Sequence, residues 1–192
     1  MGRLKKYNRE DVLEKAMLAF WKNGFENTTS RILENEMGIN QNSIYSEFKN
    51  KESLFLETLN CYEDKLKTGV LKSVIESKGD LEDIRLFFNR FVERVKNGSI
   101  KNGCLLTNTT VAFGGSNDRI KEYLNQFYNQ LHDYFYDLII KAQLNGQIPK
   151  NKDVNILATY LIGCTQGLKV IVKVMDENAL SNYIDTVINS LK

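Results

Sequence analysis

The stretch Met37–Phe48, which reads MGINQNSIYSEF, decides how the N-terminal part of this chain folds. Gly38 suits the left-handed turn that ends a helix, and Asn40 suits the cap position that begins the next one. Two short helices joined by such a turn form a helix-turn-helix, whose second helix presents side chains to the major groove of DNA. We therefore expect residues Gln41 to about Glu47 to be a recognition helix.

The residues of this second helix separate into a core face and a polar face. On a helical wheel, Ile44 and Phe48 point into the core, whereas Asn42 and Ser46 point most nearly away from it. Amides and hydroxyls can pair with base edges, and Tyr45 is placed to offer its hydroxyl to a phosphate. The same pattern is also typical of a polar surface helix with no ligand.

Apolar periodicity predicts further helices around this motif. From Arg9 to about Asn23, apolar residues recur at three- and four-residue steps, and Gly24 is expected to end that helix. Thr28, Thr29 and Ser30 offer caps for the helix that precedes Gly38. A longer helix is expected from near Asn50 to about Ser77. It would connect a three-helix domain, residues 1–50, to a second domain, residues 51–192.

The second domain is predicted to be a helical bundle, so the fold class is all-α. Leu, Ile, Lys, Glu and Asn dominate the composition, and Pro149 is the only proline. The first expected bundle helix begins at Asp80 and ends at Asn97-Gly98. The second runs from Gly103 to Phe113, before a break at Gly114-Gly115. The last three run from Ser116 to Asn145, from Asp153 to about Met175, and from Glu177 to Leu191.

Charge and cysteine content bear on which ligands and which cell compartment the sequence predicts. The net charge is +2, and the basic N-terminal segment with Arg3, Lys5, Lys6 and Arg9 is either a solvated tail or an arm that contacts phosphates. The three cysteines are far apart and form no CxxC or Cys/His cluster. This pattern predicts no metal site, no cofactor and no disulfide framework, and it fits a reducing cytoplasm.

The hydropathy pattern predicts neither a signal peptide nor a membrane span. The N-terminus is polar and basic, with no apolar run behind it. The longest apolar stretch, Val154 to Met175, is interrupted by Asn155, Gln166, Lys169 and Lys173, which a bilayer would tolerate poorly.

The ordered residues of the N-terminal domain resemble the TetR family of bacterial transcriptional regulators (TetR/AcrR type). The resemblance covers Leu4 to Tyr62 and is carried by Phe20, Gly24-Phe25, Thr28-Thr29, Gly38-Ile39-Asn40, Ser43-Ile44-Tyr45, Phe48, Lys51 and Leu54-Phe55. It implies that Thr28, Thr29, Tyr45 and Lys51 touch phosphates, and that Arg31, Gln41, Asn42, Ser43 and Ser46 lie near or on base edges. Glu34 and Asn42 depart from the family pattern, which usually has small residues at these two positions.

The penultimate helix is apolar nearly all round, which favours cover by a second subunit over a purely internal core helix. The resemblance implies a homodimer in which the last two helices form a four-helix interface. The expected interface residues are Leu161, Thr165, Leu168, Ile171, Tyr183, Ile184 and Val187. Such a dimer would place two recognition helices on the half-sites of a palindromic operator in double-stranded DNA.

Aromatic residues of the second domain are candidates to line a small-molecule pocket, although such stripes are usually ordinary core. The resemblance favours a pocket, because family members typically lose DNA affinity when an effector binds. The candidates are Phe87, Phe91, Cys104, Asn108, Phe113, Tyr123, Phe127 and Tyr160. Cys104 is alternatively a redox-sensing thiol, without a resolving cysteine nearby.

The sequence lacks the residue sets that an enzyme needs. His132 is the only histidine, no Ser/His/Asp set stands out, and Gly114-Gly115 lacks the context of a phosphate-binding loop. We therefore predict a ligand-responsive transcriptional regulator, a repressor released from its operator by a small molecule. The alternative is a helical adaptor or interaction protein with a degenerate helix-turn-helix.

Overall fold

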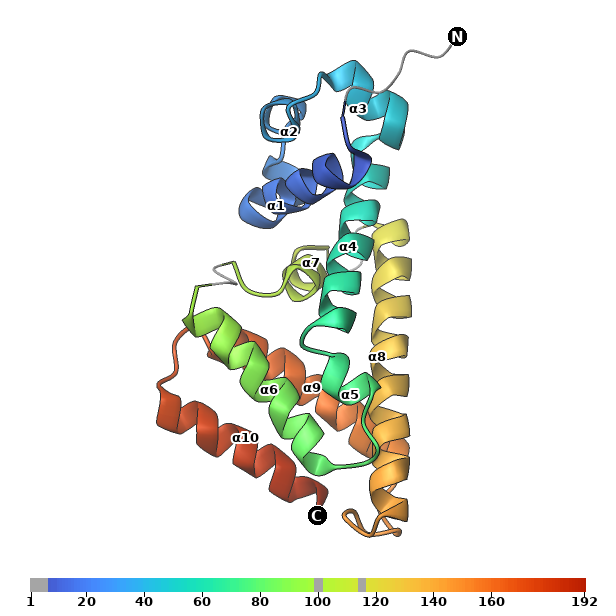
Figure 1. Cartoon of the computed structure of the whole chain (residues 1–192), viewed down its shortest axis with the longest axis vertical. Helices are drawn as coiled ribbons and strands as arrows, with labels where there is room; N and C mark the ends of the chain where they lie inside the picture. The colour runs from blue at the N-terminus through green and yellow to red at the C-terminus, as the bar shows by residue number, and fades with distance from the viewer. Residues whose placement is uncertain (1–6, 99–101, 114–116) are drawn as a thin grey trace. The chain divides into compact units, whose positions relative to one another are not determined.

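The computed structural model describes residues 7–98, 102–113 and 117–192 of the chain. Within these ranges all regular secondary structure is helical, which confirms the predicted all-α class (Figure 1). The helices are α1 (Arg9–Asn27), α2 (Ser30–Met37), α3 (Gln41–Phe48), α4 (Lys51–Thr68), α5 (Lys72–Ile75), α6 (Leu81–Lys96), α7 (Leu105–Phe113), α8 (Asp118–Leu144), α9 (Val154–Ile171) and α10 (Glu177–Leu191). Two features of the sequence lie outside the described residues, namely Arg3, Lys5 and Lys6 of the basic segment and the Gly114-Gly115 break.

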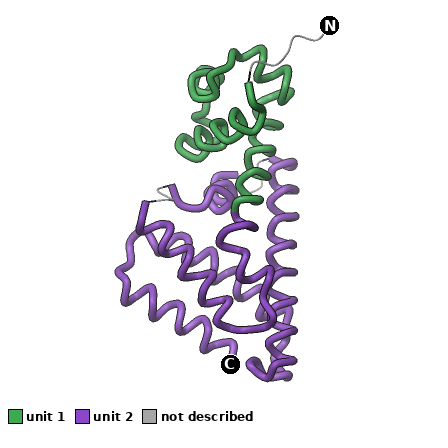
Figure 2. The backbone as a smooth tube through the Cα atoms, in the orientation of Figure 1, with its two compact units in different colours: residues 1–65 green, residues 66–192 purple. Residues whose placement is uncertain are grey.

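The chain divides into two compact units, residues 1–65 and 66–192, and the division falls within α4 (Figure 2). The sequence assigns the whole connector helix to the second domain, with a boundary after residue 50. That functional boundary stays a prediction, because compactness and function need not divide a chain at the same residue.

The first unit packs α1, α2, α3 and the N-terminal part of α4 around one apolar core. Leu33 of α2 and Ile44 and Phe48 of α3 are at most 1% exposed. The ring of Phe20 in α1 meets that of Phe55 in α4 edge-on, with 4.9 Å between centroids, a favoured aromatic geometry. This core holds the two short helices, which are too short to be stable alone.

Local chemistry ends α2 and begins α3 where the sequence predicts. Asn40 caps α3, its side chain accepting a hydrogen bond from the Ser43 N–H at 2.9 Å. Gly38 ends α2 in the left-handed conformation, with φ 71° and ψ 22°. Gly24 breaks the helical conformation with φ 76° and ψ 166°, but one further turn follows this kink, so that α1 extends to Asn27.

The connector helix is shorter than predicted. We expect a helix to about Ser77, whereas α4 ends at Thr68 and a separate short helix, α5, follows. Gly69 is a poor helix former, and the Leu71 N–H donates to the Leu66 carbonyl oxygen at 2.9 Å, which closes the helix end. The turn buries Val70, which is 3% exposed, so tertiary packing outweighs the local apolar periodicity.

The second unit is a bundle built on the long helix α8, which packs along α9 and also meets α5 and α7. Helix α6 turns its aromatic side chains inward and lies against α10, to which an ion pair between Arg85 and Asp185 joins it. The predicted start of α6 at the Asp80 cap and the bounds of α10 are confirmed. Helix α9 ends at Ile171, four residues before the predicted end, and a turn follows in which the Met175 N–H donates to the Ile171 carbonyl oxygen.

Helix α9 has the length and mean hydropathy of a membrane span, although one such helix is weak evidence for a membrane. A third of its residues, 33%, are buried. Because Gln166 and Lys169 also lie on this helix, we interpret it as a bundle helix.

Candidate nucleic-acid interface and interior cavity

Helix α3 presents a polar face to solvent. Gln41, Asn42 and Ser46 are exposed, and Ser43 and Tyr45 are partly exposed. The opposite face, with Ile44 and Phe48, is buried, so the orientation predicted from the helical wheel is confirmed. Because the exposed groups are amides and hydroxyls, this face can offer both donors and acceptors to base edges.

Two side chains cap the N-terminus of α3. Asn40 accepts from the Ser43 N–H, and the Glu34 carboxylate of α2 accepts from the Gln41 N–H at 2.5 Å. A carboxylate is favoured there by the partial positive charge of the helix N-terminus. The departure from the family pattern at Glu34 thus has a structural role, since this side chain ties α2 to the start of α3.

Tyr45 is fixed from α2. Its hydroxyl lies 2.8 Å from the Ser30 hydroxyl in a hydrogen bond. Thr29 and Arg31 are exposed at the start of α2, where the Thr29 hydroxyl accepts from the Ile32 N–H. Thr29 and Arg31 therefore lie at the N-terminal end of α2, and Tyr45 of α3 is linked to this end through Ser30. Polar groups beside a helix N-terminus are suited to contact phosphates.

Thr28 does not share this exposure. Its residue surface is 0% exposed, and its hydroxyl donates to the Gly24 carbonyl oxygen at 2.6 Å. A buried hydroxyl whose proton is already engaged cannot reach a phosphate, so the predicted phosphate contact of Thr28 is corrected to a structural role. Thr28 fastens the chain after the kink at Gly24.

Two lysines lie just after the recognition helix. The Lys51 ammonium donates to the Glu26 carbonyl oxygen at 3.3 Å and lies 4.4 Å from the centroid of the Phe25 ring. Partial burial lowers the pKa of Lys51. Lys49 is exposed and adopts φ 70° and ψ −60°, where the Asn50 N–H donates to the Phe48 carbonyl oxygen in a γ-turn. This turn is uncommon for a residue with a side chain and ends α3 sharply.

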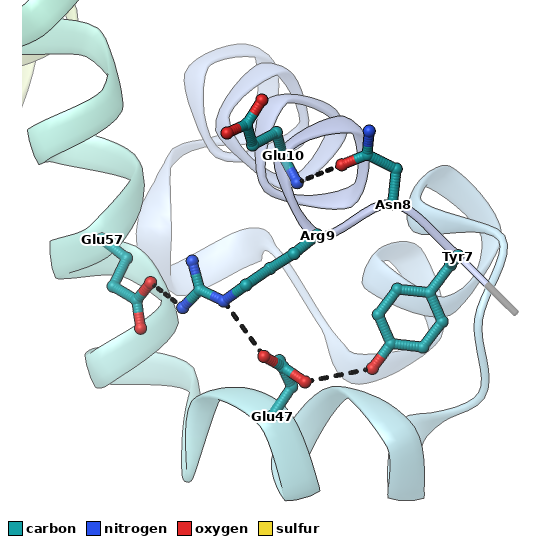
Figure 3. A network of polar contacts seen from close by, with 6 residues as sticks. All are labelled: Tyr7, Asn8, Arg9, Glu10, Glu47 and Glu57. Atoms are coloured by element: carbon teal, nitrogen blue, oxygen red, sulfur yellow. Dashed lines mark hydrogen bonds and ion pairs between the residues drawn. The ribbon is translucent and has the colours of Figure 1, made fainter. Parts of the chain in front are cut away.

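A polar network joins α3 to the start of α1 and to α4 (Figure 3). The Arg9 guanidinium joins Glu47 of α3, at 3.0 Å, to Glu57 of α4, and the Tyr7 hydroxyl donates to Glu47 at 3.3 Å. The guanidinium also lies 4.9 Å from the centroid of the Phe48 ring. The hydrogen bond that Arg9 donates to Glu57, with a smaller contribution from Glu47, raises the pKa of Arg9. Arg9 is therefore a positioning residue in this structure and not a free phosphate ligand.

The predicted dimer-interface residues mostly face the core of their own subunit. Five of them are at most 2% exposed, and Ile171 and Tyr183 are partly exposed. A side chain without exposed surface cannot contact a second subunit, so this part of the prediction is corrected. The five buried residues are Leu161, Thr165, Leu168, Ile184 and Val187.

The exposed side of α9 carries the apolar surface that the core does not cover. Ile156 is 67% exposed, Tyr160 39% and Val170 60%. With Gly163 and Gly167 they recur at steps of four and three, the spacing of a helix–helix seam. A Cβ at Gly163 would meet nothing within 4 Å, so another backbone can approach closely there. We call these five residues the α9 seam.

A small cavity lies inside the second unit, among the predicted pocket residues Phe87, Phe91 and Phe127. It has a volume of about 10 Å³, room for roughly one water molecule. The structure does not bring all candidates to it. The amide of Asn108 is exposed and donates to the Asn102 carbonyl oxygen, and Tyr160 lies on the α9 seam.

The remaining candidates are placed around helix α7 and the start of α8. Cys104 and Phe113 are buried at the two ends of α7, and Tyr123 is partly exposed on α8. None of these three lines the cavity. Cys104 is 1% exposed, and a thiol so buried is poorly accessible to oxidants.

Sequence reasoning missed the residues that orient the site. Glu34, Arg9 and Glu47 act through contacts between residues distant in sequence, which no local pattern reveals. Lys169 also lines the cavity, and here a signal existed, since a charge in an otherwise apolar helix is unusual.

Two sequence families match most of the chain. Residues 12–58 match the bacterial regulatory proteins of the tetR family, and residues 81–188 match the tetracyclin repressor-like C-terminal domain. The chain is 26% identical over 194 residues to the uncharacterised HTH-type transcriptional regulator YezE of Bacillus subtilis, with 100% of both chains covered. It is also 26% identical to the HTH-type transcriptional repressor ComR of Escherichia coli, covering 88% of this chain and 81% of ComR.

A solved structure has the same fold. A cysteine mutant of the TetR family transcriptional regulator CifR, complexed with a 26-base-pair operator DNA, superimposes with a TM-score of 0.87. The match covers 99% of this chain and 100% of that one at 20% identity.

Proposed function

Because this chain belongs to the tetR family of bacterial regulatory proteins, we propose that it is a cytoplasmic repressor, without enzymatic activity, that leaves its palindromic operator when a small molecule binds the second unit. The observation that carries the proposal is the recognition helix α3, which is buried on one face, capped at its start and anchored from behind by Arg9. A rigidly held helix with an outward polar face is what base reading requires.

The proposed DNA contacts divide into two kinds. Gln41, Asn42, Ser43, Ser46 and Arg31 are assigned to base edges or their vicinity, and Asn42 and Gln41 have the geometry to pair with adenine. Thr29, Tyr45 and Lys51 are assigned to phosphates, which position the protein without reading sequence. Thr28 is omitted because it is buried.

We assign the dimer surface to the α9 seam, together with the partly exposed Tyr183 of α10. Exposed Ile156 and Val170 would lose their contact with water when a second copy of the helix packs on them. Tyr183 crosses α9 at Gly167, and its hydroxyl donates to the Cys164 carbonyl oxygen at 2.7 Å. A Cβ added at Gly167 would lie only 3.1 Å from this hydroxyl, so a side chain there would displace the contact.

The interior cavity is the proposed effector site. Leu66 at the end of α4, and Val70 and Leu71 in the turn that follows, line its wall. A ligand that needs more room than one water would displace this turn, at the end of the connector helix. It would release DNA only if it bound the displaced form more tightly than the closed form.

Fluorescence anisotropy with a duplex from upstream of the protein's own coding region tests the DNA-binding proposal. A regulator should bind this duplex about 10³–10⁷-fold more tightly than an unrelated duplex at the same salt, with log affinity falling linearly as log salt rises. An adaptor with a degenerate motif would bind both duplexes equally weakly. Equal binding therefore contradicts the proposal.

A further inference from the structure

The interior cavity is lined by one charged side chain, by the hydroxyl-bearing Thr165 and otherwise by apolar residues. Its walls come from α6, α8, α9 and the turn after α4, and they include three phenylalanines. Lys169 of α9 also lines it and is only 7% exposed. A larger hollow of about 480 Å³ lies between α6 and α10, but its lysine, Lys96, is already paired with Glu177 at 2.7 Å.

Lys169 has neither an ion pair nor a hydrogen bond within the part of the chain that the structure describes. Burying an ammonium without a partner is unfavourable, so such groups are rare in protein interiors. Lys169 lies in the last turn of α9, whose partial negative charge offsets part of this cost. The full negative charge of a bound ligand group would offset much more of the cost of burying the ammonium.

A second unsatisfied donor lies one turn earlier on the same helix. The Nε2 of Gln166 is buried and has no hydrogen-bond partner among the described residues. Its Oε1 is held by the Thr107 hydroxyl, which donates at 2.7 Å. Gln166 and Lys169 are three residues apart and therefore neighbours on the helix surface. Gln166 does not line the closed cavity, so one ligand group would meet both the Gln166 N–H and the Lys169 cation only in a widened cavity.

We propose that Lys169 and Gln166 recognise the carboxylate of an amphipathic monocarboxylic acid, whose apolar body occupies the phenylalanine-lined cavity. This proposal rests on the proposed effector site and names its ligand class. A single cation balances a single negative charge, whereas a phosphate dianion would bring a second charge into apolar surroundings at a large desolvation cost. The acid must widen the closed cavity, because about 10 Å³ holds no more than a water molecule.

Calorimetric titration of the full-length protein with matched probes tests the ligand class. The probes are octanoate against octanamide, and phenylacetate against phenylacetamide, because each pair shares its body and differs in charge. We expect at least one acid to bind at least about tenfold more tightly than its amide, the effect of a hydrogen bond to a charged group. If neither acid binds more tightly than its amide, the proposal is wrong.

Variants then locate the effect. Lys169→Met should reduce the affinity for the acid to that for the amide, whereas Lys121→Met, which changes an exposed lysine of α8, should leave it unchanged. Equal acid binding by Lys169→Met and the wild type would overturn the assignment to Lys169.

A measurement without ligand gives an independent test. Replacing a buried cation that has no partner by an apolar group of similar shape is stabilising, so Tm of Lys169→Met should rise by at least about 2 °C. A fall in Tm would show that Lys169 has a structural partner and would overturn the proposal. Operator binding by the wild type is measured separately. If it is absent while acid binding is present, the repressor function fails and the ligand class stands.

Discussion

At the scale of single residues, the polar face of α3 combines groups that can read bases with groups that can hold phosphates. Asn42 is exposed on this face, and Tyr45 at its edge is hydrogen-bonded to the Ser30 hydroxyl. Removing each should therefore have a different consequence for sequence discrimination.

We expect Asn42→Ala to reduce operator affinity by about 1–3 kcal/mol and to relax the preference at one base pair. Tyr45→Phe should weaken binding to every duplex alike, by about 0.5–1.5 kcal/mol, because it removes one hydroxyl. Anisotropy titrations with the operator, single-base variants of it and an unrelated duplex distinguish the two. If Asn42→Ala lost the same affinity for every duplex, Asn42 would not be a base-reading residue.

Glu34 is the residue whose role differs most from that of the small residue usual in the family. Glu34→Ala removes the acceptor at the start of α3, so the free energy of unfolding should fall by about 0.5–2 kcal/mol. It also removes a negative charge beside the proposed phosphate path, so affinity for unrelated DNA should rise. Urea denaturation and anisotropy measure the two effects. Glu36→Ala, on the exposed side of the same helix, is the control, and equal losses of stability in both variants would argue against the cap.

At the scale of elements, glycines with positive φ shape the turns between helices. Gly38 has φ 71° with open space around it, whereas Gly79 has φ 94° and lies against the backbone of α8. A Cβ at Gly79 would come within 2.5 Å of the Lys141 carbonyl carbon. The two positions therefore separate backbone strain from steric overlap.

Gly38→Ala should lower the free energy of unfolding by about 1–2 kcal/mol, from the left-handed backbone alone. Gly79→Ala should lower it by more, because the turn before α6 must also move away from α8. Urea denaturation followed by circular dichroism measures both. Similar losses in the two variants would mean that the contact between Gly79 and α8 relaxes without cost.

At the scale of the whole molecule, the dimer surface that we propose on the α9 seam would determine whether one recognition helix or two meet the operator. Two half-sites read by one dimer lie about 34–36 Å apart on the duplex. Linking two weak contacts raises the effective concentration of the second, so a monomer should bind the operator far more weakly.

Val170→Asp should give a monomer with unchanged helical content, because Val170 is 60% exposed and its subunit does not need it for packing. Operator affinity should fall by at least about tenfold as the second half-site contact becomes independent. Sedimentation velocity and anisotropy measure the two quantities. Val111→Asp, at a valine that is 78% exposed on α7, is the matched control. A dimeric Val170→Asp protein would place the interface elsewhere.

The sequence by itself determined the helical class, the recognition helix and most helix ends. These features depend on local chemistry, because each involves only residues close together in the sequence. Examples are the Asn40 and Asp80 caps, the left-handed Gly38, and the apolar spacing of Ile44 and Phe48. Their energetics need no knowledge of distant parts of the chain.

Tertiary structure alone decided which apolar surfaces are covered and which polar groups find partners. Leu168 and Val170 are equally apolar and two residues apart, yet one is 1% exposed and the other 60%. Likewise, packing made Thr28 structural, brought Arg9 together with Glu47 and Glu57, and left Lys169 buried without a partner among the described residues. Burial depends on neighbours that are distant in sequence. Helical periodicity shows which face of a helix is apolar, but it does not show what packs against that face.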